Sequence, residues 1–187
     1  MSADAREDLG YVRDVVRRSE RRTMPRAILW LWAAISVPGF AIIDAAPERA
    51  GLYWLVAGGA GFLLSAWLGA RGARTIGQRS EETGRRHMLH WAGMGLAIFL
   101  VSFGAEGWGS TPRGSSHAIL LMVALSYWLA GVHLVPALKW MGVVAAAVYV
   151  ALAFLEGFPY PWTAAGIVIA AGLVVASFAG GTAGAEG

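Results

Sequence analysis

Long apolar runs separated by short charged stretches dominate the hydrophobic pattern of this 187-residue chain. Six such runs follow one another, at residues 27–43, 52–70, 88–103, 115–135, 140–155 and 162–178. Each is close to the roughly 20 apolar residues that an α-helix needs to cross a bilayer. The pattern therefore predicts an all-α fold, an integral membrane helical bundle with six transmembrane helices.

Polar segments flank the predicted bundle, which takes up residues 27–179. The first 26 residues carry seven arginines, and Leu9, Val12 and Val16 recur at the spacing of one helix face. This pattern predicts a basic amphipathic arm at 1–26, which would lie on an anionic lipid surface, stay solvated or dock on a partner. Residues 180–187 are small and nearly uncharged, as is typical of a flexible tail.

The basic residues fall mostly on one side of the predicted bundle. If the N-terminus is cytoplasmic, the inside segments hold seven arginines, five arginines and one lysine, whereas the outside loops hold only Arg49 and Arg113. By the positive-inside rule, both termini are therefore expected in the cytoplasm. The arm has no apolar signal-peptide core and the loops are compact, which favours a bacterial-type inner membrane. The arginines orient the protein in the lipid bilayer, and nucleic acid is not expected as a partner.

Two features of the first two spans concern helix packing. A stripe of small residues recurs at every fourth position of the second span: Ala57, Gly61, Ser65 and Gly69. Such a stripe predicts close packing on another helix. Pro38 and Gly39 lie well inside the first span, where proline removes a backbone donor and favours a kink. That kink would be either a hinge or a consequence of packing. Residues 44–49, between the two spans, are expected to form a short polar loop.

The composition excludes several classes of function. The chain has no cysteine, which excludes disulfides, thiolate metal sites and cysteine nucleophiles. Only 14% of the residues are charged, and none of these lies near the middle of a predicted span. This argues against a proton-coupled transporter built on a buried carboxylate. No catalytic or nucleotide-binding motif is present, so the chain is not expected to be an enzyme.

All four histidines lie between His87 and His133, in the predicted hairpin of the third and fourth spans. Antiparallel packing of these spans would bring His90 and His133 to a similar depth. Two imidazoles on facing helices can ligate a haem iron or a transition metal. The alternative is that these histidines are structural residues at the membrane interface. Since no second pair or carboxylate supports them, the sequence predicts neither a dedicated metal site nor a bound cofactor.

Ser126, Tyr127 and Trp128 stand out because they place polar groups deep in the fourth span. In lipid, such groups usually bond to a neighbouring helix, since an unpaired hydroxyl or indole is costly there. The alternative is that these three side chains line a small ligand cavity, with Pro38 and Gly39 as its hinge.

Three hypotheses for the function follow. The first is a non-enzymatic membrane subunit or regulatory partner, which contacts a membrane or cytoplasmic protein through the basic arm and the arginine-rich loop at 71–86. The second is a transporter or channel for a small, weakly charged solute, with Pro38-Gly39 as its hinge and Tyr127 and Trp128 near its path. The third is a haem- or metal-binding protein that uses His90 and His133. The sequence is also compatible with a homo-oligomer, and it does not identify a substrate.

Overall fold

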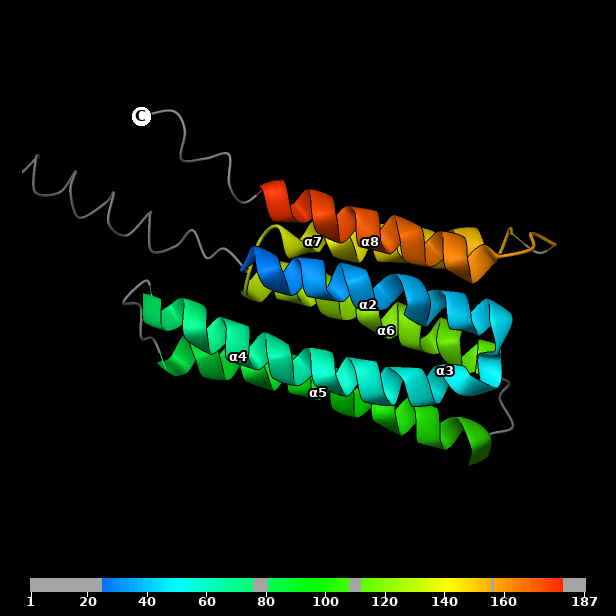
Figure 1. Ribbon diagram of the computed structural model, residues 1–187, viewed down its shortest axis with the longest axis horizontal. Helices are drawn as coiled ribbons and strands as arrows, with labels where there is room; N and C mark the ends of the chain where they lie inside the picture. The colour runs from blue at the N-terminus through cyan, green and yellow to red at the C-terminus, as the bar shows by residue number, and fades with distance from the viewer. Residues whose placement is uncertain (1–24, 76–80, 108–111, 156, 180–187) are drawn as a thin grey trace, which may run out of the picture.

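The computed structural model describes residues 25–75, 81–107, 112–155 and 157–179, and every regular element in these ranges is a helix (Figure 1). In chain order they are α2 (Arg26–Ala45), α3 (Pro47–Tyr53), the π-helix η1 (Trp54–Gly58), α4 (Gly59–Thr75), α5 (Glu81–Gly107), α6 (Pro112–His133), α7 (Leu138–Leu152) and α8 (Pro161–Ala179). Because α3, η1 and α4 follow one another without a break, the described ranges contain six helical segments. The prediction of an all-α fold with six helices is confirmed.

Four of the described segments are long and apolar enough to cross a membrane: Arg26–Ala45, Pro47–Gly72, Gly114–His133 and Pro161–Phe178. The α7 helix is also apolar but shorter, with 15 residues, and α5 is longer, with 27 residues and several charged residues in its first turns. A helix suits these apolar stretches because it satisfies its backbone hydrogen bonds within one segment, which lipid cannot do for it.

The six segments lie side by side with their axes roughly parallel (Figure 1). The most extensive packing is between α2 and α8 and between α6 and α7, and α7 also contacts α8. These four helices form the body of the bundle. On the side away from α8, α4 contacts α2 and α5 contacts α6.

Glycines allow close approaches between helices of this four-helix body, for example between α6 and α7 and between α2 and α8. A Cβ added to Gly142 of α7 would lie 2.6 Å from the backbone nitrogen of Trp128 in α6. A Cβ added to Gly166 of α8 would lie 2.7 Å from the Cβ of Phe40 in α2. Any larger residue at these positions would push the helices apart, since small residues are what allows helices to approach closely in lipid. The largest fully buried side chains nearby are Leu120, Leu138 and Leu173.

The α4 and α5 helices are held less tightly than the other four. Between Gly84 and Ser102 of α5 no residue is fully buried, and Gly61 is the one fully buried residue between Gly59 and Gly72. Gly61 faces the Ile35 side chain of α2. Ser65 Oγ accepts a hydrogen bond of 3.1 Å from Trp32 Nε1, which also belongs to α2. The predicted packing role is therefore confirmed for Gly61 and Ser65, whose partner is α2, whereas a Cβ added to Gly69 would meet nothing within 4 Å.

Two connections differ from the sequence prediction. The predicted loop at 44–49 is largely helical, because α2 continues past Asp44 and α3 begins at Pro47. Proline suits the first position of a helix, and Glu48 suits the first turn, next to the positive end of the helix dipole. The predicted loop at 71–86 is also shorter, since α4 continues to Thr75 and α5 begins at Glu81. The predicted arm up to residue 24 and the predicted tail from residue 180 lie outside the described ranges.

Candidate functional site

Apart from Arg49, the basic residues whose side chains the structure describes gather at one end of the bundle. Arg26 lies at the start of α2, and Arg71 lies near the end of α4. Arg85 and Arg86 lie near the start of α5, and Lys139 lies at the start of α7. These four helix ends are together on the left of Figure 1. We call this end of the molecule the basic end.

Three cations of the basic end lie over aromatic rings. The guanidinium carbon of Arg26 lies 5.9 Å from the centre of the Phe178 ring, and that of Arg71 lies 5.5 Å from the Trp67 ring. The ammonium nitrogen of Lys139 lies 5.4 Å from the centre of the Trp140 ring. All three rings are exposed over half of their area or more. Basic and aromatic side chains at the ends of apolar helices are typical of a membrane–water interface. The basic end therefore combines the two kinds of side chain that are typical of such an interface.

The opposite end of the bundle carries a cap between two helices. Asp44, near the end of α2, accepts hydrogen bonds from the backbone N–H groups of Trp162, at 3.3 Å, and Thr163, at 2.7 Å. It also accepts one from the Thr163 hydroxyl, at 2.8 Å. The carboxylate thus satisfies amides that the first turn of α8 leaves free and lies at the positive end of its dipole. These contacts assign Asp44 a structural role.

Aromatic rings cross the bundle next to this cap. Phe40 lies between Trp54 and Trp162, with ring centres 5.9 and 6.1 Å apart. Trp162 is only 3% exposed, and the His117 ring contacts it edge-on at 4.7 Å. The rings come from η1, α2, α8 and α6, so His117 is part of the packing that joins these helices.

The contact between α5 and α6 brings several predicted site residues together. His90 Nε2 lies 3.0 Å from the backbone oxygen of Ser126. Because a carbonyl oxygen only accepts, His90 donates this bond and Nε2 carries the proton. The next residue, Trp91, packs against Tyr127 with ring centres 5.4 Å apart. The indole nitrogen of Trp91 is buried and has no hydrogen-bond partner in the described part of the chain. We call these four residues the α5–α6 junction.

The other predicted residues of α6 lie outside this junction. Trp128 is 45% exposed. His133 is also exposed and follows Ser126 by seven residues, which is roughly 10 Å along the helix axis at 1.5 Å per residue. The structure thus pairs His90 with Ser126, and binding of a haem or metal by His90 and His133 stays a prediction. The described residues contain no group of three or more His, Cys, Asp or Glu that could hold a metal ion.

Pro38 and Gly39 lie inside the continuous helix α2, and Gly39 contacts the start of the π-helix η1. A Cβ added to Gly39 would lie 2.5 Å from the Trp54 ring and 2.8 Å from the Tyr53 ring. The Tyr53 hydroxyl donates a hydrogen bond of 2.8 Å to the backbone oxygen of Ile35. Trp54 is the first residue of η1, so the proline step of α2 adjoins the π-helix of the next segment. Both features weaken regular α-helical bonding locally.

Among the residues of these sites, Trp54, Trp91 and Asp44 were not identified as site residues from the sequence. A short π-helix has no hydrophobic pattern that distinguishes it from an α-helix, so the residues around Trp54 do not indicate that a π-helix begins there. Asp44 caps an amide 119 residues away, and a partner so distant in the sequence cannot be found from the spacing of neighbouring residues. Trp91 did have a signal, because it follows His90 directly on the same predicted helix.

No family model, curated protein or solved structure matches this chain, so its function has to be inferred from the arrangement of its own side chains.

Proposed function

We propose that this protein is a non-enzymatic subunit or regulatory partner in a bacterial-type inner membrane, which contacts another protein through its basic end. The observation that best supports this proposal is the gathering of Arg26, Arg71, Arg85, Arg86 and Lys139 at that end. The chain preceding α2 adds six more arginines up to residue 24. A dense patch of one charge steers and selects partners of opposite charge, so the partner surface is acidic.

The same charges support a topology of six spans with both termini in the cytoplasm, since basic residues are retained on that side. Cysteine labelling tests it without background, because the chain has no cysteine of its own. Gly84→Cys lies at the basic end and Gly51→Cys at the other, and a Cβ at either position meets nothing within 4 Å. In intact cells a membrane-impermeant maleimide should label Gly51→Cys and leave Gly84→Cys unlabelled. The reverse labelling would overturn this topology.

The partner contact is tested by photo-crosslinking in native membranes from a probe on Gly84→Cys. Replacing Arg85 and Arg86 by glutamine, or deleting residues 2–22, should abolish the crosslinked species. Arg49→Gln is the matched control, because Arg49 is also exposed but lies at the opposite end, 3.9 Å from Glu48. If the crosslink survives both changes at the basic end, the proposed contact surface is wrong.

A second candidate function, transport of a small, weakly charged solute, is supported by the contact between Pro38-Gly39 and η1. A helix proline that adjoins a π-helix forms a place where α2 and the α3–α4 segment can bend against each other. Tyr127 would supply a polar group beside the path. In proteoliposomes, Pro38→Ala and Tyr127→Phe should each lower the flux of such a solute several-fold. Flux that is insensitive to both changes would rule this candidate out.

A further inference from the structure

Two of the cation–aromatic pairs at the basic end continue into columns of exposed side chains. On α4, Leu63, Trp67 and Arg71 follow one another at intervals of four residues, which places them above one another on one helix face. Leu63 is 70% exposed and Trp67 is 54% exposed. From the apolar part of the helix to its end, this column runs from aliphatic to aromatic to cationic.

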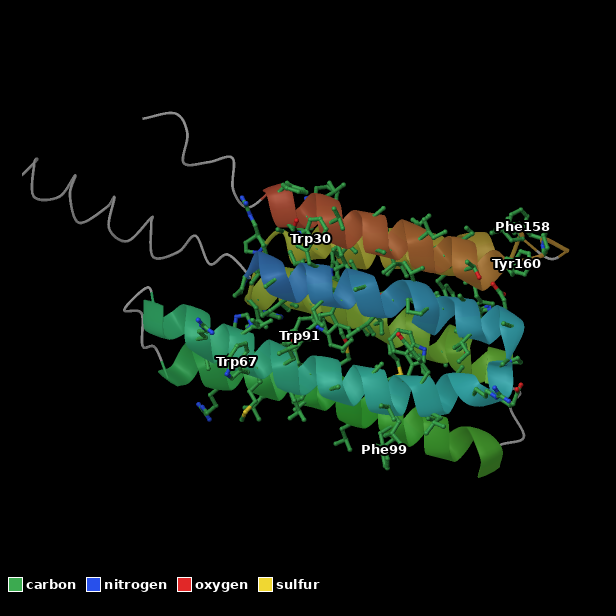
Figure 2. The ribbon with its side chains drawn as sticks, in the orientation of Figure 1. Trp30, Trp67, Trp91, Phe99, Phe158 and Tyr160 are labelled. Atoms are coloured by element: carbon green, nitrogen blue, oxygen red, sulfur yellow. The ribbon has the colours of Figure 1, made fainter. Side chains whose placement is uncertain are left out.

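The second column is built by α8 and α2 together. Arg26 of α2 lies over the exposed ring of Phe178 near the end of α8, and Trp30, one turn further along α2, contacts the same ring edge-on at 6.2 Å. Val175, one turn deeper on α8, is 67% exposed. Figure 2 shows Trp30 beside α8 and Trp67 on α4, both near the end where α2 begins. The order of side chains is again aliphatic, aromatic and cationic.

We propose that these two columns bind anionic phospholipids, with Arg26 and Arg71 each holding a headgroup phosphate. A guanidinium that lies over a ring contacts it through its face, so the donors in its plane have the geometry that matches the oxygens of a phosphate. The aromatic ring lies at the depth of the glycerol backbone, and the aliphatic residue lies at the depth of the acyl chain. Free phosphate would use only the cationic top of such a column.

The charge of the surroundings favours anionic over zwitterionic lipids. Arg85, Arg86 and Lys139 lie at the same end of the bundle and repel the ammonium or choline group of a zwitterionic headgroup. Pro25 also lies against Gly72, at 3.6 Å from the position of an added Cβ, so Arg26 and Arg71 start from adjacent points of the backbone. The two sites are therefore neighbours on the rim of the bundle. They do not depend on the proposed contact with a protein partner.

Lipid retention by the purified full-length protein tests this proposal. The protein is reconstituted in phosphatidylcholine vesicles that contain a minority of phosphatidylglycerol, extracted in mild detergent and examined by native mass spectrometry. Replacing both arginines by glutamine should lower retained phosphatidylglycerol about fivefold, and Arg26→Gln or Arg71→Gln alone should lower it by roughly half, because the other site remains. Arg49→Gln should leave retention unchanged. Arg26→Lys and Arg71→Lys should retain intermediate amounts, since they keep the charge but lose the planar donors.

Four results would overturn the proposal. Wild-type retention by the glutamine variants would exclude both arginines, and an equal loss in Arg49→Gln would show that charge alone governs retention. Displacement of the lipid by inorganic phosphate at low millimolar concentration would show that the sites take free phosphate. Full retention by the lysine variants would exclude the role given to the guanidinium plane.

Discussion

Asp44 and Thr163 are 119 residues apart in the sequence, yet the carboxylate of Asp44 caps the helix that begins beside Thr163, with bonds of 2.7 Å to its amide and 2.8 Å to its hydroxyl. The contact ties the end of α2 to the start of α8, the two helices that pack most extensively. It therefore links the first described helix to the last, and it accounts for a charged residue at this position without a catalytic role.

Replacing Asp44 by alanine should lower the free energy of unfolding by about 1–2 kcal/mol, the usual effect of losing a helix N-cap. Asp44→Asn should lose less, because asparagine keeps an oxygen that can accept the Thr163 amide. Thr163→Val removes only the hydroxyl bond and should lie between the wild type and Asp44→Ala. Unfolding in detergent, followed by circular dichroism, measures all three. Equal stability of Asp44→Ala and the wild type would contradict the cap.

The crossing of α6 and α7 at Gly142 gives a steric prediction. A Cβ there would lie 2.6 Å from the Trp128 nitrogen and 2.9 Å from the Ala124 oxygen, and backbone atoms cannot turn aside as a side chain does. Gly142→Ala should therefore cost about 1–3 kcal/mol of unfolding free energy, as overpacking does in other cores.

Gly95→Ala is the matched control for this crossing. Gly95 also lies inside a helix, but its added Cβ would meet nothing within 4 Å. This change should leave stability unchanged or raise it by up to about 1 kcal/mol, through the better helix propensity of alanine. If both variants unfold at the same denaturant concentration, the crossing is not as close as described.

The hydrogen bond from His90 to Ser126 is a main polar link between α5 and the body of the bundle. Since no residue between Gly84 and Ser102 is fully buried, His90→Leu should loosen α5 and leave α6 and α7 in place. We expect a loss of about 1 kcal/mol, the typical net value of one such bond. Hydrogen–deuterium exchange should be faster in α5 amides and unchanged in α7. Leu89→Ala, at an adjacent and exposed position, should change neither. Unchanged exchange in α5 would refute this link.

The positions of the helices could be predicted from the sequence, because long apolar runs that end at charged residues indicate helices of this length. The predicted spans at 27–43 and 162–178 correspond closely to the helices Arg26–Ala45 and Pro161–Ala179. The stripe through Gly61 and Ser65 was also informative, since small residues at every fourth position mark a face that can approach another helix.

The contacts between helices could not be predicted in the same way. The depth and rotation of a helix depend on the helices that it packs against. The contact between His90 and Ser126 follows from the depth and rotation of α5 and α6, which their own sequences do not specify. Trp54, which contacts Gly39, begins a π-helix, and a π-helix shifts the side chains that follow it without changing the composition of the segment. The sequence therefore indicated which residues are chemically unusual. It did not indicate their partners, because those are set by packing between segments that are far apart in the chain.

Trp32 and Trp91 allow the α5–α6 junction to be tested with a matched pair. Both are partly buried tryptophans that pack on the core, but the Trp32 indole donates to Ser65 at 3.1 Å, whereas the Trp91 indole has no partner in the described part of the chain. A buried donor without an acceptor costs about 1–3 kcal/mol, and replacing it by an apolar group relieves that cost.

Trp91→Phe should therefore destabilise the protein less than Trp32→Phe, by about 1–3 kcal/mol, because the two changes remove similar ring area. The comparison is made by unfolding in the same detergent and again in lipid bicelles. If Trp91→Phe is as costly as Trp32→Phe in lipid but not in detergent, the Trp91 indole bonds to an acceptor that the membrane supplies. A lipid-dependent cost of this kind would point to a ligand at the α5–α6 junction, next to Tyr127, and would favour the transport hypothesis. Equal costs in both media would mean that the chain itself supplies the acceptor, contrary to the geometry of the described residues.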